Sequence, residues 1–108
     1  MTLKILVKLI KLIFQIRRAN INNLEQYRVF YMVAKEGGFS KAADKLFISQ
    51  SAVSQSIKQL EINSGAELFI RLRSGIKLTK EGKMLLEHIA PAIERIRAGE
   101  KRLADMAN

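Results

Sequence analysis

The sequence of 108 residues contains no cysteine, no tryptophan, one proline and a single histidine, His88. Without cysteine the chain has no disulfide framework, no zinc finger and no thiol nucleophile, and one imidazole cannot supply the paired histidines of most catalytic zinc sites. It also has no phosphate-cradling glycine loop and no convergent pair of carboxylates. We therefore expect neither an enzyme nor a bound metal or cofactor. A hydrophobic share of 48% fits one small folded domain.

Acidic residues are scarce as well. Ten Asp and Glu stand against 19 Lys and Arg, which gives a formal net charge of +9. Five of the basic residues and none of the acidic ones fall in residues 1–23, so the rest of the chain is only moderately basic. This excess favours a polyanionic partner, although it is also an ordinary route to solubility.

Residues 1–23 are expected to form an extension outside the functional domain. Between residues 3 and 18, polar side chains recur in steps of four and three and form one narrow stripe on a helix that is otherwise apolar. The stripe interrupts both a transmembrane span and a signal peptide. An appendage is the favoured interpretation, ahead of contact with an anionic membrane and packing onto the body. The stripe consists of Lys4, Lys8, Lys11, Gln15 and Arg18.

From Leu24 the pattern becomes that of a compact helical domain. A first helix with one apolar face should end at Gly37 and Gly38, because glycine readily adopts the left-handed conformation that closes a helix. Ser40 is expected to cap a short second helix, and its small residues would let another helix approach closely. In the following turn, Phe47 and Ile48 are expected to point into the core.

A third helix should begin after the cap Ser49, run from Gln50 to about Asn63, and stop at Gly65. Its apolar residues converge in one narrow sector, at about 100° per residue, and its polar residues cluster on the opposite side. Two short helices joined by a tight turn predict a helix-turn-helix, whose second helix can enter a major groove. A plain solvated face is the alternative. The apolar sector is Val53, Ile57 and Leu60, and the polar one is Ser51, Ser54, Gln55 and Lys58.

Two short strands are predicted next, from Glu67 to Arg71 and from Ile76 to Leu78, around a turn that contains Ser74 and Gly75. This hairpin has three basic residues, Arg71, Arg73 and Lys77. Beside a helix that reads bases, such a wing can contact the phosphate backbone or a minor groove. A structural hairpin with solvated basic side chains is the alternative.

Thr79 is predicted to cap a long final helix over residues 80–108. Its apolar residues follow a spacing typical of heptad a and d positions, which predicts a dimer seam, with packing against the first helix as the alternative. Pro91 should kink this helix or break it near His88 to Ala90. The predicted seam consists of Leu86, Ile89, Ile93, Ile96 and Leu103.

The stretch GGFSKAADKLFISQSAVSQSIKQLE, followed by LF, Arg71 and IKLTKEG, resembles the N-terminal domain of LysR-type transcriptional regulators. The resemblance implies a mainly α winged helix-turn-helix, with a three-helix core and a two-stranded wing, over residues 24–79. It also implies a linker helix over residues 80–108 that dimerises the domain. The family's positions for contacts with double-stranded DNA fall here on Gln50, Ser51, Ser54, Gln55, Lys58, Arg71 and Arg73.

Three residues depart from the family's pattern. Ser51 stands where many relatives have proline, Ile70 where an acid is frequent, and Gln55 where arginine is common. Glutamine in place of arginine would weaken guanine readout and favour contacts with adenine or thymine. The resemblance further implies a larger effector-binding domain of about 200 residues, for which this chain has no room, so no small-molecule effector site is expected.

The leading hypothesis is therefore a sequence-specific DNA-binding regulator that forms a homodimer and acts in the cytoplasm, at the nucleoid. The second hypothesis is an interaction protein. In that case the final helix pairs with a full-length relative, or residues 3–18 attach the chain to a membrane. Salt dependence separates the two, because binding to phosphates weakens steeply as salt rises.

Overall fold

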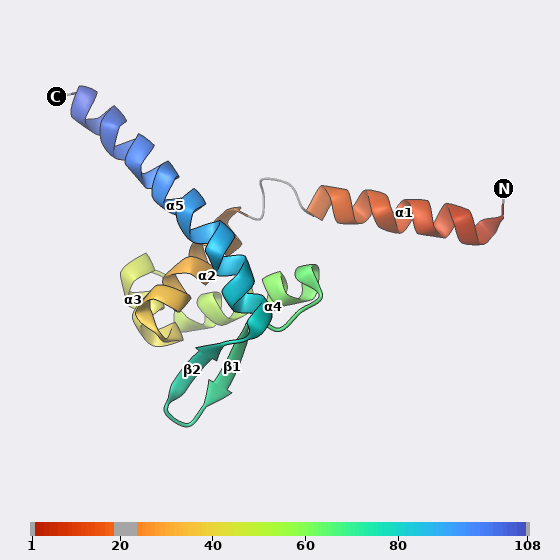
Figure 1. The fold of residues 1–108 in the computed structure, drawn as a ribbon, viewed down its shortest axis with the longest axis horizontal. Coiled ribbons are helices and arrows are strands. Elements are labelled where there is room, and N and C mark those ends of the chain that lie inside the picture. Colours follow the sequence, from red (N-terminus) through yellow and green to blue (C-terminus); the bar gives the residue numbers. More distant parts are fainter. Residues whose placement is uncertain (1, 19–23, 108) are drawn as a thin grey trace.

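The computed structural model describes residues 2–18 and 24–107 and contains a winged helix-turn-helix followed by a long helix (Figure 1). The predicted fold class is confirmed. The boundary predicted at residue 23 lies outside the described residues. In chain order the elements are α1 (Leu3–Arg18), α2 (Leu24–Glu36), α3 (Phe39–Leu46), α4 (Gln50–Ser64), β1 (Phe69–Leu72), β2 (Gly75–Leu78) and α5 (Lys80–Met106).

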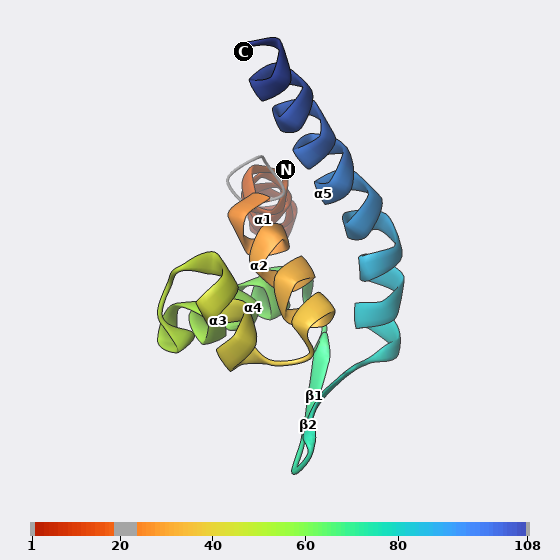
Figure 2. The same cartoon turned by 90° about the vertical axis from the view of Figure 1, so that its left-hand side faces the viewer.

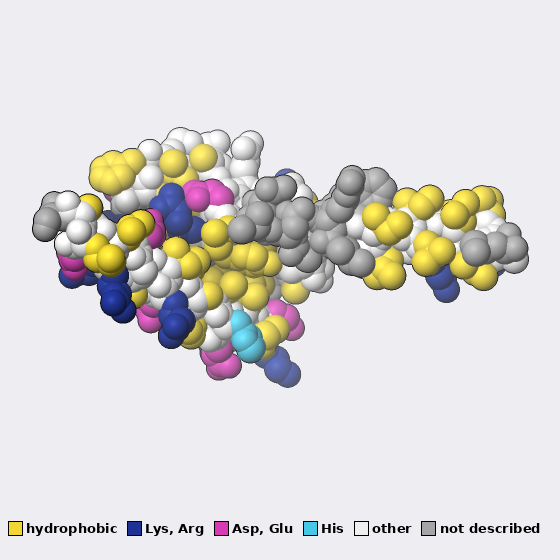
Figure 3. Space-filling view, turned by 90° about the horizontal axis from the view of Figure 1, so that it is seen from above, with side chains coloured by type: hydrophobic (Ala, Val, Ile, Leu, Met, Phe, Trp, Pro, Cys, Tyr) yellow, Lys and Arg dark blue, Asp and Glu magenta, His cyan; other side chains and the backbone are white. Residues whose placement is uncertain are grey.

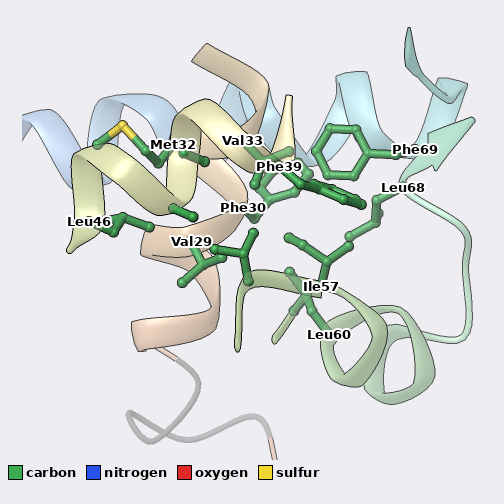
Figure 4. Close-up of a cluster of buried hydrophobic side chains, with 13 residues drawn as sticks. Val29, Phe30, Met32, Val33, Phe39, Leu46, Ile57, Leu60, Leu68 and Phe69 are labelled. Atoms are coloured by element: carbon green, nitrogen blue, oxygen red, sulfur yellow. The ribbon is translucent and has the colours of Figure 1, made fainter. Parts of the chain in front are cut away.

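The core lies where α2, α3, α4 and β1 meet (Figure 4). Phe30 of α2 is fully buried, and its ring lies 5.4 Å from that of Phe69 in β1, centroid to centroid. Phe39, the first residue of α3, meets the same Phe69 ring edge-on at 6.1 Å. Contacts of this kind add to the hydrophobic burial. One aromatic cluster therefore fixes the wing relative to the helix-turn-helix.

The start of α3 differs from the prediction. Gly38, not Ser40, occupies the cap position, and no side chain caps the helix there. The first residue of α3 is Phe39, directly after Gly38, and its ring is buried in the core. Ser40 consequently lies inside the first turn, exposed to solvent. Burial of an aromatic ring outweighs the gain from a serine cap, which is worth about 1 kcal/mol.

The expectation that Phe47 and Ile48 point into the core is also wrong. Phe47 is 94% exposed and Ile48 36% exposed. Phe47 closes α3 in the left-handed conformation, at φ 57°, and its backbone N–H lies toward the carbonyls of Ala43 and Asp44. This turn of the backbone directs the Phe47 side chain away from the helices behind it.

The predicted caps of α4 and α5 are confirmed. The Ser49 hydroxyl accepts a hydrogen bond of 3.0 Å from the backbone N–H of Ala52, and α4 ends at Gly65 with φ 73°. Thr79 caps α5 in the same way, accepting from the N–H of Gly82 at 2.9 Å. These bonds satisfy N–H groups that have no acceptor inside their own helices.

The wing is an antiparallel pair in which Phe69 faces Leu78 and Leu72 faces Gly75. Its strands start two residues later, at Phe69, and one residue earlier, at Gly75, than the sequence predicts. Gly75 has a φ of 134°, which other residues rarely adopt. Figures 1 and 2 show the wing and the C-terminal end of α5 at opposite ends of the molecule.

The base of the wing is held from two sides. The Glu61 carboxylate accepts a hydrogen bond of 2.7 Å from the Leu68 N–H, and the Thr79 hydroxyl donates one of 2.6 Å to the Glu67 carbonyl. Gly82 of α5 packs directly on the Leu68 carbonyl, where a Cβ would collide. The wing, α4 and α5 therefore meet at one rigid junction.

Of the kink or break predicted at Pro91, the break is absent, because helix α5 is uninterrupted from Lys80 to Met106, and Figure 2 shows the helix bending. Proline removes one helical hydrogen bond and crowds the preceding turn, which bends a helix without ending it when the flanking turns are held. Packing on α2 provides that support. The Tyr31 hydroxyl donates a hydrogen bond of 3.3 Å to Glu94, three residues after Pro91.

None of the described side chains of helix α1, from Leu3 to Ile13, belongs to the core cluster. The described side chains from Leu3 to Ile13 are all exposed, so packing of this part onto the body is not observed. The side chains of Gln15 and Arg18, the last two members of the predicted polar stripe, lie outside the described residues. Within residues 2–18 and 24–107, no helix has both the length and the apolar character needed to cross a bilayer.

Candidate nucleic-acid interface

The two faces of α4 differ as the sequence predicts. Val53, Ile57 and Leu60 are at most 3% exposed and face the core. The opposite side is open: Gln50, Ser51, Gln55 and Lys58 are exposed and Ser54 is half-buried. None of these five side chains is buried. The outward side of α4 is therefore free to lie against a flat or grooved partner.

The N-terminal end of α4 adds a directional feature to this side. The Ser49 hydroxyl accepts a hydrogen bond from the N–H of Ala52, while the N–H groups of Gln50 and Ser51 have no acceptor within the helix. Gln50 and Ser51, which form this first turn, are exposed. A helix N-terminus has a partial positive charge, and phosphates are stabilised there. The start of α4 can thus hold an anion, and Gln55, farther along the same helix, is exposed.

A groove runs between α4 and the wing. Ser54, Gln55 and Lys58 line it from the helix side and Arg71 lines it from β1. The structure therefore brings Arg71 together with the polar face of α4, although the two are separated by a turn and part of a strand in the sequence. Glu61 also lines the groove, with its carboxylate engaged by the Leu68 N–H.

Arg71 is oriented by an aromatic ring. Its guanidinium carbon lies 4.7 Å from the centre of the Phe39 ring. Stacking of this kind restricts the guanidinium while its N–H groups stay free for an acceptor in the groove. Arg71 is in this way prepared to bind a phosphate, and less side-chain entropy is lost on binding.

Arg73 is separate from this group. It occupies the turn between β1 and β2, where it is exposed, and it does not line the groove. Lys77, on β2, lines a different depression together with Lys80 and Lys83. The basic residues of the wing are therefore distributed over its tip and both sides.

Sequence reasoning missed two residues of this surface. Phe39, which lies under Arg71, falls before the helix predicted to start after Ser40 and carries no predicted role, and Phe47 is predicted to point into the core. Phe47 instead lies exposed two residues before the cap of α4. The available signal was the position of Phe47: it follows Leu46 directly, and Leu46 is the last residue of the apolar pattern of α3. The residue-type pattern alone does not show that it adopts a positive φ.

The predicted dimer seam divides into two parts. Leu86 and Ile89 are partly buried against the core, and Ile93 is only 4% exposed. Ile96 and Leu103, farther along α5, are 44% and 70% exposed. The first three residues therefore pack on their own chain, as the alternative interpretation of the pattern has it, and the last two are open to a partner.

Comparison with known proteins gives this arrangement a context. Residues 24–83 match the profile of the bacterial regulatory helix-turn-helix proteins of the lysR family. The chain belongs to the LysR family. Related sequences include the transcriptional regulators y4mQ of Sinorhizobium fredii, 38% identical over 82 residues, and YusT of Bacillus subtilis, 41% identical over 80. These alignments cover 76% and 74% of this chain but only 28% and 27% of the relatives.

Two solved structures of the LysR family resemble the fold along almost their whole length. One is the complex of the BenM DNA-binding domain with catB site 1 DNA, with a TM-score of 0.69 and 30% identity, covering 79% of this chain and 96% of that one. The other is the complex of the CbnR DNA-binding domain with DNA, with a TM-score of 0.64 and 30% identity, covering 78% and 97%. Both of those domains are described bound to DNA.

Proposed function

We propose that this LysR-family chain binds double-stranded DNA in a sequence-dependent manner and regulates transcription from the bacterial chromosome in the cytoplasm. In this proposal α4 lies in the major groove, where Gln55 reads base edges beside Ser51 and Ser54. Lys58 and the wing residues Arg71 and Arg73 hold the flanking phosphates. Residues 24–79 form the DNA-binding unit.

The observation that carries the proposal is the uncovered polar side of α4 together with the stacked Arg71 in one groove. If the polar side of α4 were only a solvated face, the stacking of the Arg71 guanidinium on Phe39 beside it would have no function. The body's moderate excess of basic residues adds a non-specific attraction to the phosphate backbone. Gln55 favours adenine, because its amide can bond both the N6 and N7 positions of that base.

We further propose that residues 80–108 pair two copies of the chain along the distal half of α5. Ile96 and Leu103 are exposed there and are seven residues apart, which places them on one side of a helix. Two-fold pairing would present two α4 helices to two half-sites of an operator.

Fluorescence anisotropy over a series of salt concentrations tests the DNA contacts. It compares two duplexes: the one that the chain prefers, here called the selected duplex, and one of random sequence. Arg71→Ala should weaken binding to both duplexes alike and reduce the salt slope by about one unit, because it removes a phosphate contact. Gln55→Ala should lose about 1 to 3 kcal/mol on the selected duplex and almost nothing on the random one.

Arg102→Ala is the matched control for Arg71→Ala, since it removes the same charge from the exposed distal part of α5. An equal loss in both variants would reduce the wing contact to a general charge effect. Equal losses of Gln55→Ala on both duplexes would refute base reading by Gln55. Binding that does not change with salt would overturn the proposal as a whole.

A further inference from the structure

Helix α1 exposes an unusually large apolar surface. Eight large aliphatic side chains between residues 3 and 13 are 43% to 76% exposed, and none of them belongs to the core cluster. Figure 3 shows hydrophobic side chains spread over the visible side of this helix. A contiguous apolar surface of this kind marks a contact site in a soluble protein. The eight are Leu3, Ile5, Leu6, Val7, Leu9, Ile10, Leu12 and Ile13.

The same helix has a cationic side. At about 100° per residue, Lys4, Lys8 and Lys11 fall within an arc of roughly 60°, and Leu6 and Ile13 lie on the opposite side. The sequence of α1, LKILVKLIKLIFQIRR, contains no acidic residue. The lysines therefore have no intrahelical partner, and any occupant of this surface must accept aliphatic side chains and positive charge together.

An anionic lipid bilayer is the occupant that offers both. Duplex DNA provides phosphates but no acyl region in which eight aliphatic side chains could be buried. A second copy of α1 provides apolar area but brings another set of like charges, and the rest of the chain is also net basic. At a bilayer surface the aliphatic side chains enter the acyl boundary while the lysines meet anionic headgroups.

The length of α1 determines how it would lie. Its 16 residues extend about 24 Å at about 1.5 Å per residue, short of the roughly 30 Å of a bilayer's hydrocarbon core. We propose that α1 lies in the plane of an anionic membrane surface and tethers the chain to it. This proposal does not depend on DNA binding, because it uses none of the side chains assigned to DNA.

Vesicle flotation with the full chain tests the tether. The chain should float with phosphatidylcholine vesicles that contain phosphatidylglycerol, and at least about tenfold less with phosphatidylcholine alone, because the headgroup charge is missing. The variant Leu6→Gln/Leu9→Gln should bind the anionic vesicles at least about tenfold more weakly, because it removes apolar area from α1. Glutamine preserves the helix propensity of leucine closely, so the helix itself is not the variable.

The matched control is Met84→Gln/Met106→Gln, which removes two exposed apolar side chains, 54% and 79% exposed, from α5. This variant should float as the unchanged chain does. Equal losses in the two variants would overturn the proposal, and so would equal flotation with neutral and anionic vesicles. Assembly that Leu6→Gln/Leu9→Gln abolishes, without any vesicle binding by the unchanged chain, would identify a second copy as the occupant and would also overturn it.

A labelled duplex in the same gradient separates this proposal from the DNA-binding one. The unchanged chain should carry the duplex up with anionic vesicles. Leu6→Gln/Leu9→Gln should leave chain and duplex together at the bottom, with an unchanged anisotropy signal for DNA binding and an unchanged melting curve. Arg71→Ala should float while it carries less duplex. If Leu6→Gln/Leu9→Gln floats as much as the unchanged chain, the membrane-tether proposal is wrong, and the DNA-binding proposal is unaffected.

Discussion

Helices α4 and α5 each have one apolar stripe, and the structure uses the two stripes differently. In α4 the stripe is covered along its whole length, from Val53 at 0% exposure to Leu60 at 2%. In α5 it is covered as far as Ile93, at 4%, and open at Ile96 and Leu103. The cause is length. The 27 residues of α5 extend about 40 Å, beyond what α2 can cover, so the same pattern stabilises the fold in one half and stays exposed in the other.

The largest effect is expected where the stripe of α5 is buried. Ile93→Asp places a carboxylate against the body at a position that is 4% exposed and should lower the free energy of unfolding by about 3 kcal/mol. Urea unfolding followed by circular dichroism measures it. A loss below about 0.5 kcal/mol would show that the proximal half of α5 is not held on the body in solution.

A smaller effect on folding, but a clear one on assembly, is expected in the exposed half. Leu103→Asp should shift the chain from dimer to monomer in sedimentation equilibrium, while the unfolding free energy of the monomer changes by no more than about 0.5 kcal/mol. Ala98→Asp, exposed and on the other side of α5, is the control and should leave the dimer intact. Dimers that survive Leu103→Asp would place the pairing surface elsewhere.

The smallest effect concerns the point where α5 meets α2. Burial, followed by the charge of Glu94 and the hydrogen bond to it, raises the pKa of Tyr31 above its ordinary value of 10.0, while Arg97 opposes the shift. Lys35 and Arg97 also lie near the ring, at 5.8 and 5.4 Å from its centre.

The raised pKa sets the direction of the pH dependence. As the pH rises above 10.0, the Tyr31 phenol loses its proton in the unfolded chain at a lower pH than in the folded chain. The stabilisation is therefore complete below about pH 10 and is lost as the pH rises through the folded pKa. Unfolding free energies measured across this range should fall more steeply in the unchanged chain than in Tyr31→Phe. Parallel curves for the two proteins would contradict the Tyr31 contact.

Helix α4 could be predicted in detail, because its signals are local. Ser49 and Gly65 delimit α4 as predicted, and the polar face of that helix is exposed as predicted. Caps and 3.6-residue periodicity depend on side chains a few residues apart, so a single sequence contains the information. The roles of Gln50, Gln55 and the other DNA-facing residues stay predictions that the experiments above address.

The errors occurred where tertiary packing or the backbone conformation of a turn decides. Ser40 is a good cap by type, yet the buried ring of Phe39 sets the start of α3. Phe47 is apolar by type, yet the left-handed backbone of the turn exposes it. Pro91 could by type either kink or break α5, and of these two the break does not occur, because α5 continues through it while packed on α2. In each case tertiary packing or backbone geometry outweighed the local preference.

The sequence by itself determined which segments become helices, where α4 is capped, and that one side of α4 is polar, because hydrogen bonds and periodicity over a few residues specify these features. Only the tertiary structure decided that Arg71 stacks on Phe39 beside that polar side, and where along α5 the apolar stripe stops being covered. Both depend on how far elements that are separate in the chain approach one another, and no local preference sets that distance.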